Sequence, residues 1–273
     1  CEQISPDGVF IGIDQDADAI DQARRTLSVD DSRTHIVHGN FVELPLFLSE
    51  LGISAVDGIL IDIGLSFHQI EASGRGFSFN REEPLDMRMD TRSPVTAADL
   101  VATMSERELA QTFSRYGEER WSGRIARYLV EYRQQTAVTT SGQLAQLVSE
   151  AVPAAAVRSQ KIHPATRVFM ALRIAVNREL EVLDRFLDSA VALLKPAGRL
   201  CVLSFHSLED RIVKHRFRNM ADPCTCPPSF PQCACGRQAT VALLTRKVMR
   251  PSEQEVRNNP MARSTRLRAV EKL

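Results

Sequence analysis

The sequence predicts an α/β protein whose parallel sheet is interrupted by an all-helical insertion. Short apolar runs alternate with helical segments before residue 63, and this alternation is typical of βαβ units. From residue 95 to residue 162 every candidate element is helical, and strand candidates return further along the chain. We therefore expect one α/β domain formed by residues 1–94 and 163–273, with residues 95–162 as a helical insertion.

The elements of the α/β part follow from apolar runs and from the residues that end them. A buried strand is expected where an apolar run ends in an acid, as before Asp14 and Asp62. Pro164 suits the start of a helix, and Lys195-Pro196-Ala197-Gly198 suits its end. The sequence predicts strands over 9–13, 34–39, 56–62, 200–203, 241–248 and 267–270, helices over 17–27, 44–51 and 164–194, and a further helix from Ser207.

Three sequence features predict helices in the insertion: a capping box, apolar residues at helical spacing, and a proline that ends a helix. Ser105 and Glu108 have the spacing of a capping box, which predicts that a helix begins there. Residues 141–152 read as another helix that Pro153 ends. One helical face between these two is predicted by the spacing of Trp121, Ile125, Tyr128, Leu129 and Tyr132.

The charge balance excludes some classes of protein. The chain has 34 Lys+Arg and 34 Asp+Glu, which argues against a general nucleic-acid coat. Residues 1–137 hold 13 basic and 23 acidic residues, a net charge of −10, and residues 138–273 hold 21 and 11, a net charge of +10. This asymmetry indicates either a segregated partner surface or two halves that neutralise each other. No apolar stretch approaches the ~18 residues of a membrane helix, and the N-terminus does not look like a signal peptide, so we expect a soluble, cytoplasmic protein.

Two acids follow strands at the edge where ligands bind in open α/β sheets. Asp14 ends the run Gly12-Ile13-Asp14, and Asp62 ends Leu60-Ile61-Asp62. An acid in this position can accept the hydroxyl groups of a ribose; the alternative is an ordinary helix cap. The glycine-rich turn that should follow a first strand is absent, and we expect that strand and turn to lie before Cys1.

A glycine-rich loop and a cysteine cluster are the other unusual stretches. Arg75 and Phe77 lie in Gly74-Arg75-Gly76-Phe77-Ser78-Phe79, and their side chains, if exposed, suit stacking on unpaired bases. The alternative is a loop that packs on its own phenylalanines. Cys224, Cys226, Cys233 and Cys235 have a spacing tighter than most zinc sites, so zinc and reduced loop thiols both remain open and no metal ligand is assigned.

Several long motifs resemble one family closely. They are Asp57-Gly-Ile-Leu-Ile-Asp62-Ile-Gly, Arg75-Gly-Phe-Ser-Phe, Pro84-Leu-Asp-Met-Arg-Met-Asp90, His163-Pro-Ala-Thr-Arg167, Ser204-Phe-His-Ser-Leu-Glu-Asp-Arg211 and Asn259-Pro-Met-Ala-Arg-Ser264. The chain resembles, nearly end to end, the bacterial family of 16S rRNA cytosine-N4 methyltransferases (RsmH, also called MraW). The resemblance implies a Rossmann-like class I methyltransferase sheet with an inserted all-helical domain, and S-adenosylmethionine as cofactor.

The resemblance also implies site residues. Asp14 matches the ribose-binding acid, Phe41 the residue beside the adenine, and Asp62 and Gln69 the remaining cofactor contacts. One departure puts Gln69 in doubt: the family usually shows Ser-Ser-Pro-Gln where this chain has Ser66-Phe67-His68-Gln69.

The implied reaction needs a group that holds the base and a group that takes a proton. The N4 amine of cytosine is a poor nucleophile, so the site must orient it and accept its proton. Asp86 and His206 lie in matching motifs and are the candidates. The alternatives are a loop-capping aspartate and a histidine at the start of a helix.

The implied partner is the 16S rRNA of the small ribosomal subunit, with a cytidine of the decoding region as target and residues 95–162 as the expected recognition domain. Basic clusters suit phosphate contacts, and a solvated helix face is the alternative. The candidate RNA-binding residues are Arg75, Phe77, Arg88, Arg211, Lys214, Arg263, Arg266 and Arg268, and Arg216 and Arg218 lie on the same predicted helix. The oligomeric state stays open between monomer and homodimer.

Two other functions remain open at this point. The missing glycine turn and the altered Ser66-Phe67-His68 stretch permit a ribosome-binding or RNA-binding factor that has kept the fold without methyl transfer. Gly12-Ile13-Asp14 taken alone also suits a nicotinamide-dependent dehydrogenase.

Overall fold

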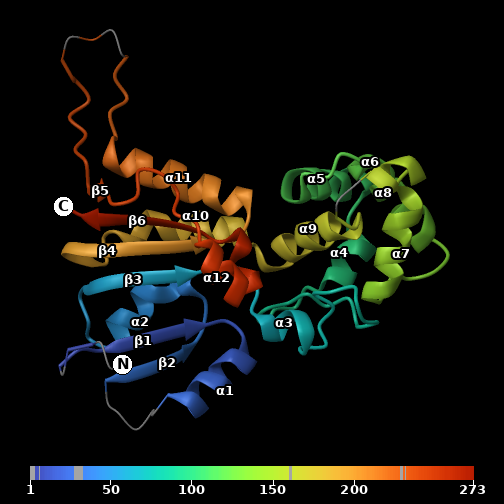
Figure 1. Ribbon diagram of the computed structural model, residues 1–273, viewed down its shortest axis with the longest axis horizontal. Helices are drawn as coiled ribbons and strands as arrows, with labels where there is room; N and C mark the ends of the chain where they lie inside the picture. Colours follow the sequence, from blue (N-terminus) through green and yellow to red (C-terminus); the bar gives the residue numbers. More distant parts are fainter. Residues whose placement is uncertain (1–3, 6, 28–32, 160–161, 228–229, 231) are drawn as a thin grey trace. The chain divides into compact units, whose positions relative to one another are not determined.

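The computed structural model describes residues 4–5, 7–27, 33–159, 162–227, 230 and 232–273 (Figure 1). The chain forms two compact units. The first unit contains residues 1–39 and 65–179, and the second contains residues 40–64 and 180–273. Among the described residues, no helix has both the length and the apolar character needed to cross a membrane.

The first unit begins with a two-stranded parallel sheet. Strand β1 (Phe10–Asp14) pairs with β2 (Thr34–His38), with Phe10 opposite Thr34 and Asp14 opposite His38. Helix α1 (Ala17–Thr26) connects them and buries Ile20. The strands and the helix predicted in this region are confirmed to within a residue or two at their ends. A short helix that the sequence did not predict, α3 (Phe67–Glu71), follows where the chain re-enters this unit.

Helices form the rest of the first unit. They are α4 (Ala97–Thr103), α5 (Glu106–Gly117), α6 (Ser122–Arg133), α7 (Ser141–Ala151), α8 (Ala154–Ser159) and α9 (Ala165–Asn177). The predicted capping box is confirmed, because Ser105 accepts from the backbone of Glu108, whose carboxylate accepts from the backbone of Ser105. On the predicted face of α6, Ile125 and Leu129 are fully buried. The hydrophobic core of these helices also contains residues of the preceding loop, from Phe77 to Met89. The boundaries 95 and 162 of the inserted domain stay a prediction.

The prediction of one long helix over 164–194 is wrong, because the helix is interrupted at Arg178. Arg178 has a φ of 51°, which ends α9 in the left-handed region, and α10 (Glu179–Ala190) begins directly afterwards. The Arg173 guanidinium donates to both carboxylate oxygens of Glu179 at 2.8 and 2.9 Å. Residues six apart lie on different faces of a continuous helix. The break therefore makes this bidentate pair possible.

The second unit contains a mixed four-stranded sheet in the order β3-β4-β6-β5. Strands β3 (Val56–Asp62) and β4 (Leu194–Ser204) are parallel, whereas β6 (Arg266–Lys272) runs antiparallel to both β4 and β5 (Val241–Leu243). The predicted parallel sheet is therefore confirmed for β3 and β4, whereas β6 runs against both of its neighbours. The strand predicted over 241–248 stops at Leu243, and β4 begins at Leu194, inside the predicted helix.

The helices of the second unit connect and flank this sheet (Figure 1). Helix α11 (Ser207–Ala221) begins at Ser207, as the sequence predicted. It buries Val213 and Phe217 and contacts β4, β5 and β6. The remaining elements are η1 (Phe41–Glu43), α2 (Leu44–Glu50), α12 (Glu253–Asn258) and η2 (Pro260–Ser264).

Two glycines of the loop before α4 provide a matched test of close packing. Gly74 and Gly76 both lie in the left-handed region, at φ values of 68° and 69°. A Cβ on Gly76 would lie 2.3 Å from the carbonyl oxygen of Pro84, whereas a Cβ on Gly74 would have no neighbour within 4 Å. We expect Gly74→Ala to lower the free energy of unfolding by about 1–2 kcal/mol, and Gly76→Ala to lower it by at least twice as much. Urea denaturation measures both values, and equal losses would contradict the proposed packing.

Candidate functional site

Asp14 ends β1 in the first unit, at the edge that the sequence predicted. Its Oδ1 accepts a hydrogen bond from the backbone N–H of Asp16 at 2.8 Å. Its carbonyl oxygen accepts from the N–H of Gly39 at 2.9 Å, just beyond β2. Asp14 is an exposed residue, yet the protein atoms around its carboxyl group raise its pKa by desolvation, and the negative charge of Asp16 adds to this effect. A carboxylate that is oriented by the backbone and incompletely hydrated is suited to accept hydroxyl groups.

Asp62 ends β3 in the second unit. Desolvation raises the pKa of its carboxyl group, and the negative charge of Glu209 raises it further. Glu209 is fully buried and accepts from the backbone N–H groups of Phe205 and His206 at 2.9 and 3.2 Å. A raised pKa makes a carboxylate a better proton acceptor. Asp62 therefore has a chemical property that the strand pattern alone did not reveal.

Asp16 is a buried residue beside Asp14 that the sequence analysis did not single out. It is only 3% exposed, and its side chain caps α1 by accepting from the backbone of Asp18. Its Oδ2 accepts from Gln69 Nε2 at 2.7 Å and from Arg75 Nη2 at 2.6 Å. The signal for the cap was present in the sequence, because an aspartate directly before a helix is a common N-cap. Its contacts with Gln69 and Arg75 could not be read from the sequence, because both partners are more than 50 positions away.

Arg75 and Phe77, the candidates for stacking on unpaired bases, are buried. Both residues are 8% exposed. Besides its contact with Asp16, Arg75 donates through Nη1 to the carbonyl oxygens of Arg88 and Met89, each at 3.0 Å. Its guanidinium lies 5.5 Å from the centre of the Phe77 ring. The loop thus follows the alternative interpretation, in which it packs on its own side chains and on the helical core.

Asp86 forms a bidentate ion pair with Arg88. Arg88 Nε and Nη2 donate to the two Asp86 carboxylate oxygens at 2.8 and 2.7 Å, and Arg88 Nη1 donates to the carbonyl oxygens of Thr91 and Ser93. The pKa of Asp86 is lowered, because the hydrogen bonds and charge of Arg88 outweigh desolvation. A lowered pKa makes a carboxylate a weak base. These contacts favour a structural role for Asp86 and Arg88 in the loop.

His206 lies at the start of α11, where both of its ring nitrogens face the same glutamate. Nδ1 accepts from the backbone N–H of Glu209 at 3.4 Å, and Nε2 lies 3.0 Å from Glu209 Oε1. His206 is thus the N-cap of α11, and its ring is engaged at the start of the helix. The geometry therefore supports the helix-cap alternative for His206.

The two other predicted cofactor residues differ in how their side chains are engaged. Phe41, at the start of η1, is half-buried and packs edge-on against Phe186, with ring centres 5.2 Å apart and an interplanar angle of 84°. Gln69 is 5% exposed; its amide nitrogen donates to Asp16 and its oxygen accepts from the backbone of Ser66 in a capping box for α3. Ser66 and Gln69 thus have a local structural purpose.

The predicted RNA-binding residues of the second unit differ in how far they are exposed. Arg211, Lys214 and Arg218 are exposed on α11, and Arg263 is exposed in η2. Arg268 instead is 9% exposed and donates to both Asp210 oxygens at 2.7 and 3.2 Å. Arg266 lies 3.9 Å from the same carboxylate, and Arg216 pairs with Asp184 and Asp188.

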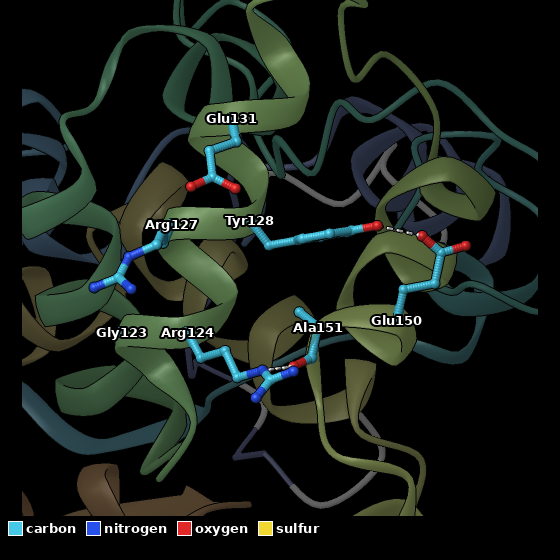
Figure 2. Close-up of a pocket in the computed structure, with 7 residues that line it drawn as sticks. All are labelled: Gly123, Arg124, Arg127, Tyr128, Glu131, Glu150 and Ala151. Atoms are coloured by element: carbon cyan, nitrogen blue, oxygen red, sulfur yellow. Dashed lines mark hydrogen bonds between the residues drawn. The ribbon is translucent and has the colours of Figure 1, made fainter.

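A pocket of about 550 Å³ lies between α6 and α7 of the first unit (Figure 2). The hydroxyl of Tyr128 donates to Glu150 at 2.8 Å across it, and Arg124 donates to the carbonyl oxygen of Ala151. None of the single residues named as candidates for cofactor, base or RNA binding lines this pocket. All of its lining residues belong to the predicted recognition domain, residues 95–162.

Arg75 allows a direct test of the buried ion pair. Arg75→Ala leaves the Asp16 carboxylate buried without its guanidinium, and we expect the free energy of unfolding to fall by about 3–5 kcal/mol. Arg92→Ala is the matched control, because it removes an exposed bidentate pair with Asp90; we expect a loss below about 1 kcal/mol. If urea denaturation gives equal losses for the two variants, the buried pair with Asp16 contributes no more to stability than the exposed pair with Asp90.

The sequence matches the MraW methylase family over residues 2–273. It is 56% identical over 272 residues to the Ribosomal RNA small subunit methyltransferase H of Desulfosudis oleivorans, covering 100% of this chain and 87% of that protein. It is 54% identical to the protein of the same name from Desulforapulum autotrophicum, covering 98% and 86% of the two chains. For the Geobacter sulfurreducens protein of that name the identity is 50%, over 100% and 87%. The chain therefore belongs to the MraW methylase family.

Proposed function

We propose that this protein is an S-adenosylmethionine-dependent methyltransferase of small-subunit rRNA, which methylates the N4 amine of a cytidine in the decoding region. The observation that carries the proposal is the match to the methylase family over residues 2–273, together with relatives at 50–56% identity that are named as small-subunit rRNA methyltransferases. Because ribosomal subunits are its substrate in this proposal, we place the protein in the cytoplasm.

The residues at the strand ends fit the methyl donor in their chemistry. S-adenosylmethionine supplies an electrophilic methyl group on a cationic sulfur. In our proposal Asp14 accepts the ribose hydroxyl groups, since its pKa is raised by desolvation and one oxygen is already oriented by the backbone. Phe41 offers a ring, held by Phe186, for the adenine. Gln69 fits a direct contact poorly, because both ends of its amide are bound within the first unit; we assign it the positioning of Asp16.

For the target amine we propose Asp62 as the hydrogen-bond and proton acceptor. Its raised pKa suits that task, whereas Asp86 is held by Arg88 and His206 by Glu209. Asp86 and His206 then act as positioning residues. Asp86 fixes the Arg88 guanidinium and with it the loop, and His206 fixes the start of α11 directly beyond β4.

The proposed RNA contacts are those of exposed cations. Arg211, Lys214 and Arg218 recur along one face of α11, with Arg263 in η2. Phosphate contacts of this kind add affinity without reading sequence. Residues 95–162 remain our proposed recognition domain.

Methylation of isolated small subunits tests the proposed reaction. Subunits from a strain that lacks the enzyme are incubated with full-length protein and S-adenosylmethionine, and their nucleosides are analysed by mass spectrometry. We expect N4-methylcytidine with the wild-type protein. We expect single-turnover rates to fall about 10²–10⁴-fold with Asp62→Asn, and to fall less with Asp86→Asn. Absence of N4-methylcytidine would overturn the proposed reaction, and a larger loss for Asp86→Asn would overturn the assignment of Asp62.

Asp14→Asn should separate binding from stability. The amide keeps an oxygen for the Asp16 N–H but loses the charge, so we expect about 10–100-fold weaker binding of S-adenosylhomocysteine by calorimetry. Because the folded-state pKa is raised above the usual 3.8, the protonated form of Asp14 favours folding at low pH, and this stabilisation disappears as pH rises through the folded pKa. The melting temperature of the variant at neutral pH should therefore equal or exceed that of wild type, and the difference should shrink below pH ~4.

Asp57→Asn is the control for the Asp14 variant. Asp57 lies near the opposite end of β3, where it forms an exposed pair with Lys195. Neither binding nor melting should change appreciably. Unchanged binding in Asp14→Asn would contradict its assignment as the ribose acceptor.

A further inference from the structure

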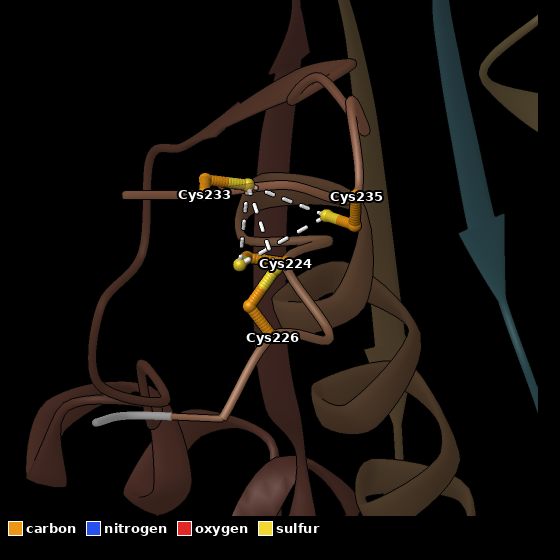
Figure 3. Close-up of side chains that lie close together, drawn as sticks. All are labelled: Cys224, Cys226, Cys233 and Cys235. Atoms are coloured by element: carbon orange, nitrogen blue, oxygen red, sulfur yellow. Dashed lines mark hydrogen bonds between the residues drawn. The ribbon is translucent and has the colours of Figure 1, made fainter. Parts of the chain in front are cut away.

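Four cysteine side chains converge in the segment between α11 and β5 of the second unit (Figure 3). The sulfur of Cys233 lies 3.6 Å from that of Cys224, 4.0 Å from that of Cys226 and 3.4 Å from that of Cys235. The sulfurs of Cys224 and Cys235 are 4.0 Å apart, and all four lie within 4.8 Å of one another. Two short Cys-x-Cys stretches, one from each side of the segment, thus present four sulfur atoms to one point.

These distances match the edges of a metal–thiolate tetrahedron. A Zn–S bond of about 2.3 Å places neighbouring sulfurs of a regular tetrahedron about 3.8 Å apart, and the observed separations lie on both sides of that value. A disulfide requires sulfurs about 2.05 Å apart, far closer than any pair here. The arrangement is therefore that of four separate ligands.

Hydrophobic packing does not account for the convergence. None of the described residues between 222 and 240 is buried, and the large side chain of Phe230 is 53% exposed. In Figure 1 the described residues that follow α11 and those that precede β5 extend away from the sheet of their unit. Thiol–thiol hydrogen bonds are weak, so the contacts present would hold these two sides together only loosely without a further ligand.

The backbone around the cysteines helps to place the sulfur atoms. The N–H of Ala234 donates to Cys226 Sγ at 3.3 Å, and Gly236 turns the chain directly after Cys235 with a φ of 65°. A cation that binds cysteine ligands displaces their protons, so the four thiols can become ligands without moving far apart or together.

We propose that Cys224, Cys226, Cys233 and Cys235 bind one Zn²⁺ ion, which joins the two sides of the segment between α11 and β5. Four sulfur ligands in a tetrahedron are typical of zinc or iron sites, and of these two metals only zinc has no redox chemistry. Four protein ligands leave no open position for water or substrate, so the ion is structural. This site is independent of the proposed methyl transfer.

Metal analysis of untagged full-length protein, purified without chelator or added metal, tests the site. We expect one zinc per chain in wild type and in Cys201→Ser, the matched control, because Cys201 lies in β4 outside the cluster. The double variant Cys233→Ser/Cys235→Ser should lose the zinc. The urea concentration at which the first unit unfolds should not change, because the helical core of that unit lacks these cysteines. Anaerobic titration of the metal-free wild type with Co²⁺ should give the visible absorption bands of tetrahedral cobalt thiolate at one ion per chain, and Zn²⁺ should abolish them.

Several outcomes would overturn the proposal. They are iron in place of zinc, disulfides in protein kept under reducing conditions, retention of zinc by the double variant, and wild-type protein that neither contains zinc nor takes up Co²⁺. Because the cobalt spectrum is recorded on wild type, the test remains decisive even if the double variant folds poorly.

Discussion

The buried contact between Asp16 and Arg75 organises the first unit around the end of β1. Asp16 caps α1 and accepts from Gln69 of α3, while Arg75 reaches the carbonyl oxygens of Arg88 and Met89. One ion pair therefore connects the strand end that carries Asp14 with a short helix and with a loop that enters the helical core. A buried pair of this kind adds little net stability compared with apolar residues of similar size. Its value here lies in fixing several segments with one set of directed hydrogen bonds.

The arginines show why a count of basic residues does not map an RNA-binding surface. Arg75, Arg88 and Arg268 each form hydrogen-bonded pairs with an aspartate, and their guanidinium groups serve the fold. Arg211, Lys214 and Arg263 are exposed. The net charge of zero therefore does not distinguish arginines that form buried ion pairs from basic residues that are exposed.

Features that depend on neighbouring residues could be predicted from the sequence. The acids at the ends of β1 and β3 and the capping box at Ser105 follow from a few adjacent positions. Features that depend on distant partners could not. Arg75 is buried where it pairs with Asp16, a residue 59 positions earlier in the sequence. The predicted long helix breaks at Arg178, where Arg173 and Glu179 form an ion pair. Likewise, local pattern carries no information on whether β6 pairs parallel or antiparallel with β4. The weak basicity of Asp86 follows from its contact with Arg88, a pairing that spacing permits but does not require.

The position of β6 has a consequence for synthesis of the chain. This strand lies between β4 and β5, and its residues Ala269 and Val270 are buried. Until residues 266–272 have left the ribosome, β4 presents an unpaired edge, and its apolar residues Leu200 and Val202 lack their antiparallel partner. Open strand edges of this kind invite non-native pairing. The sheet of the second unit is therefore complete only after residues 266–272 have been synthesised, and until then the edge of β4 stays open.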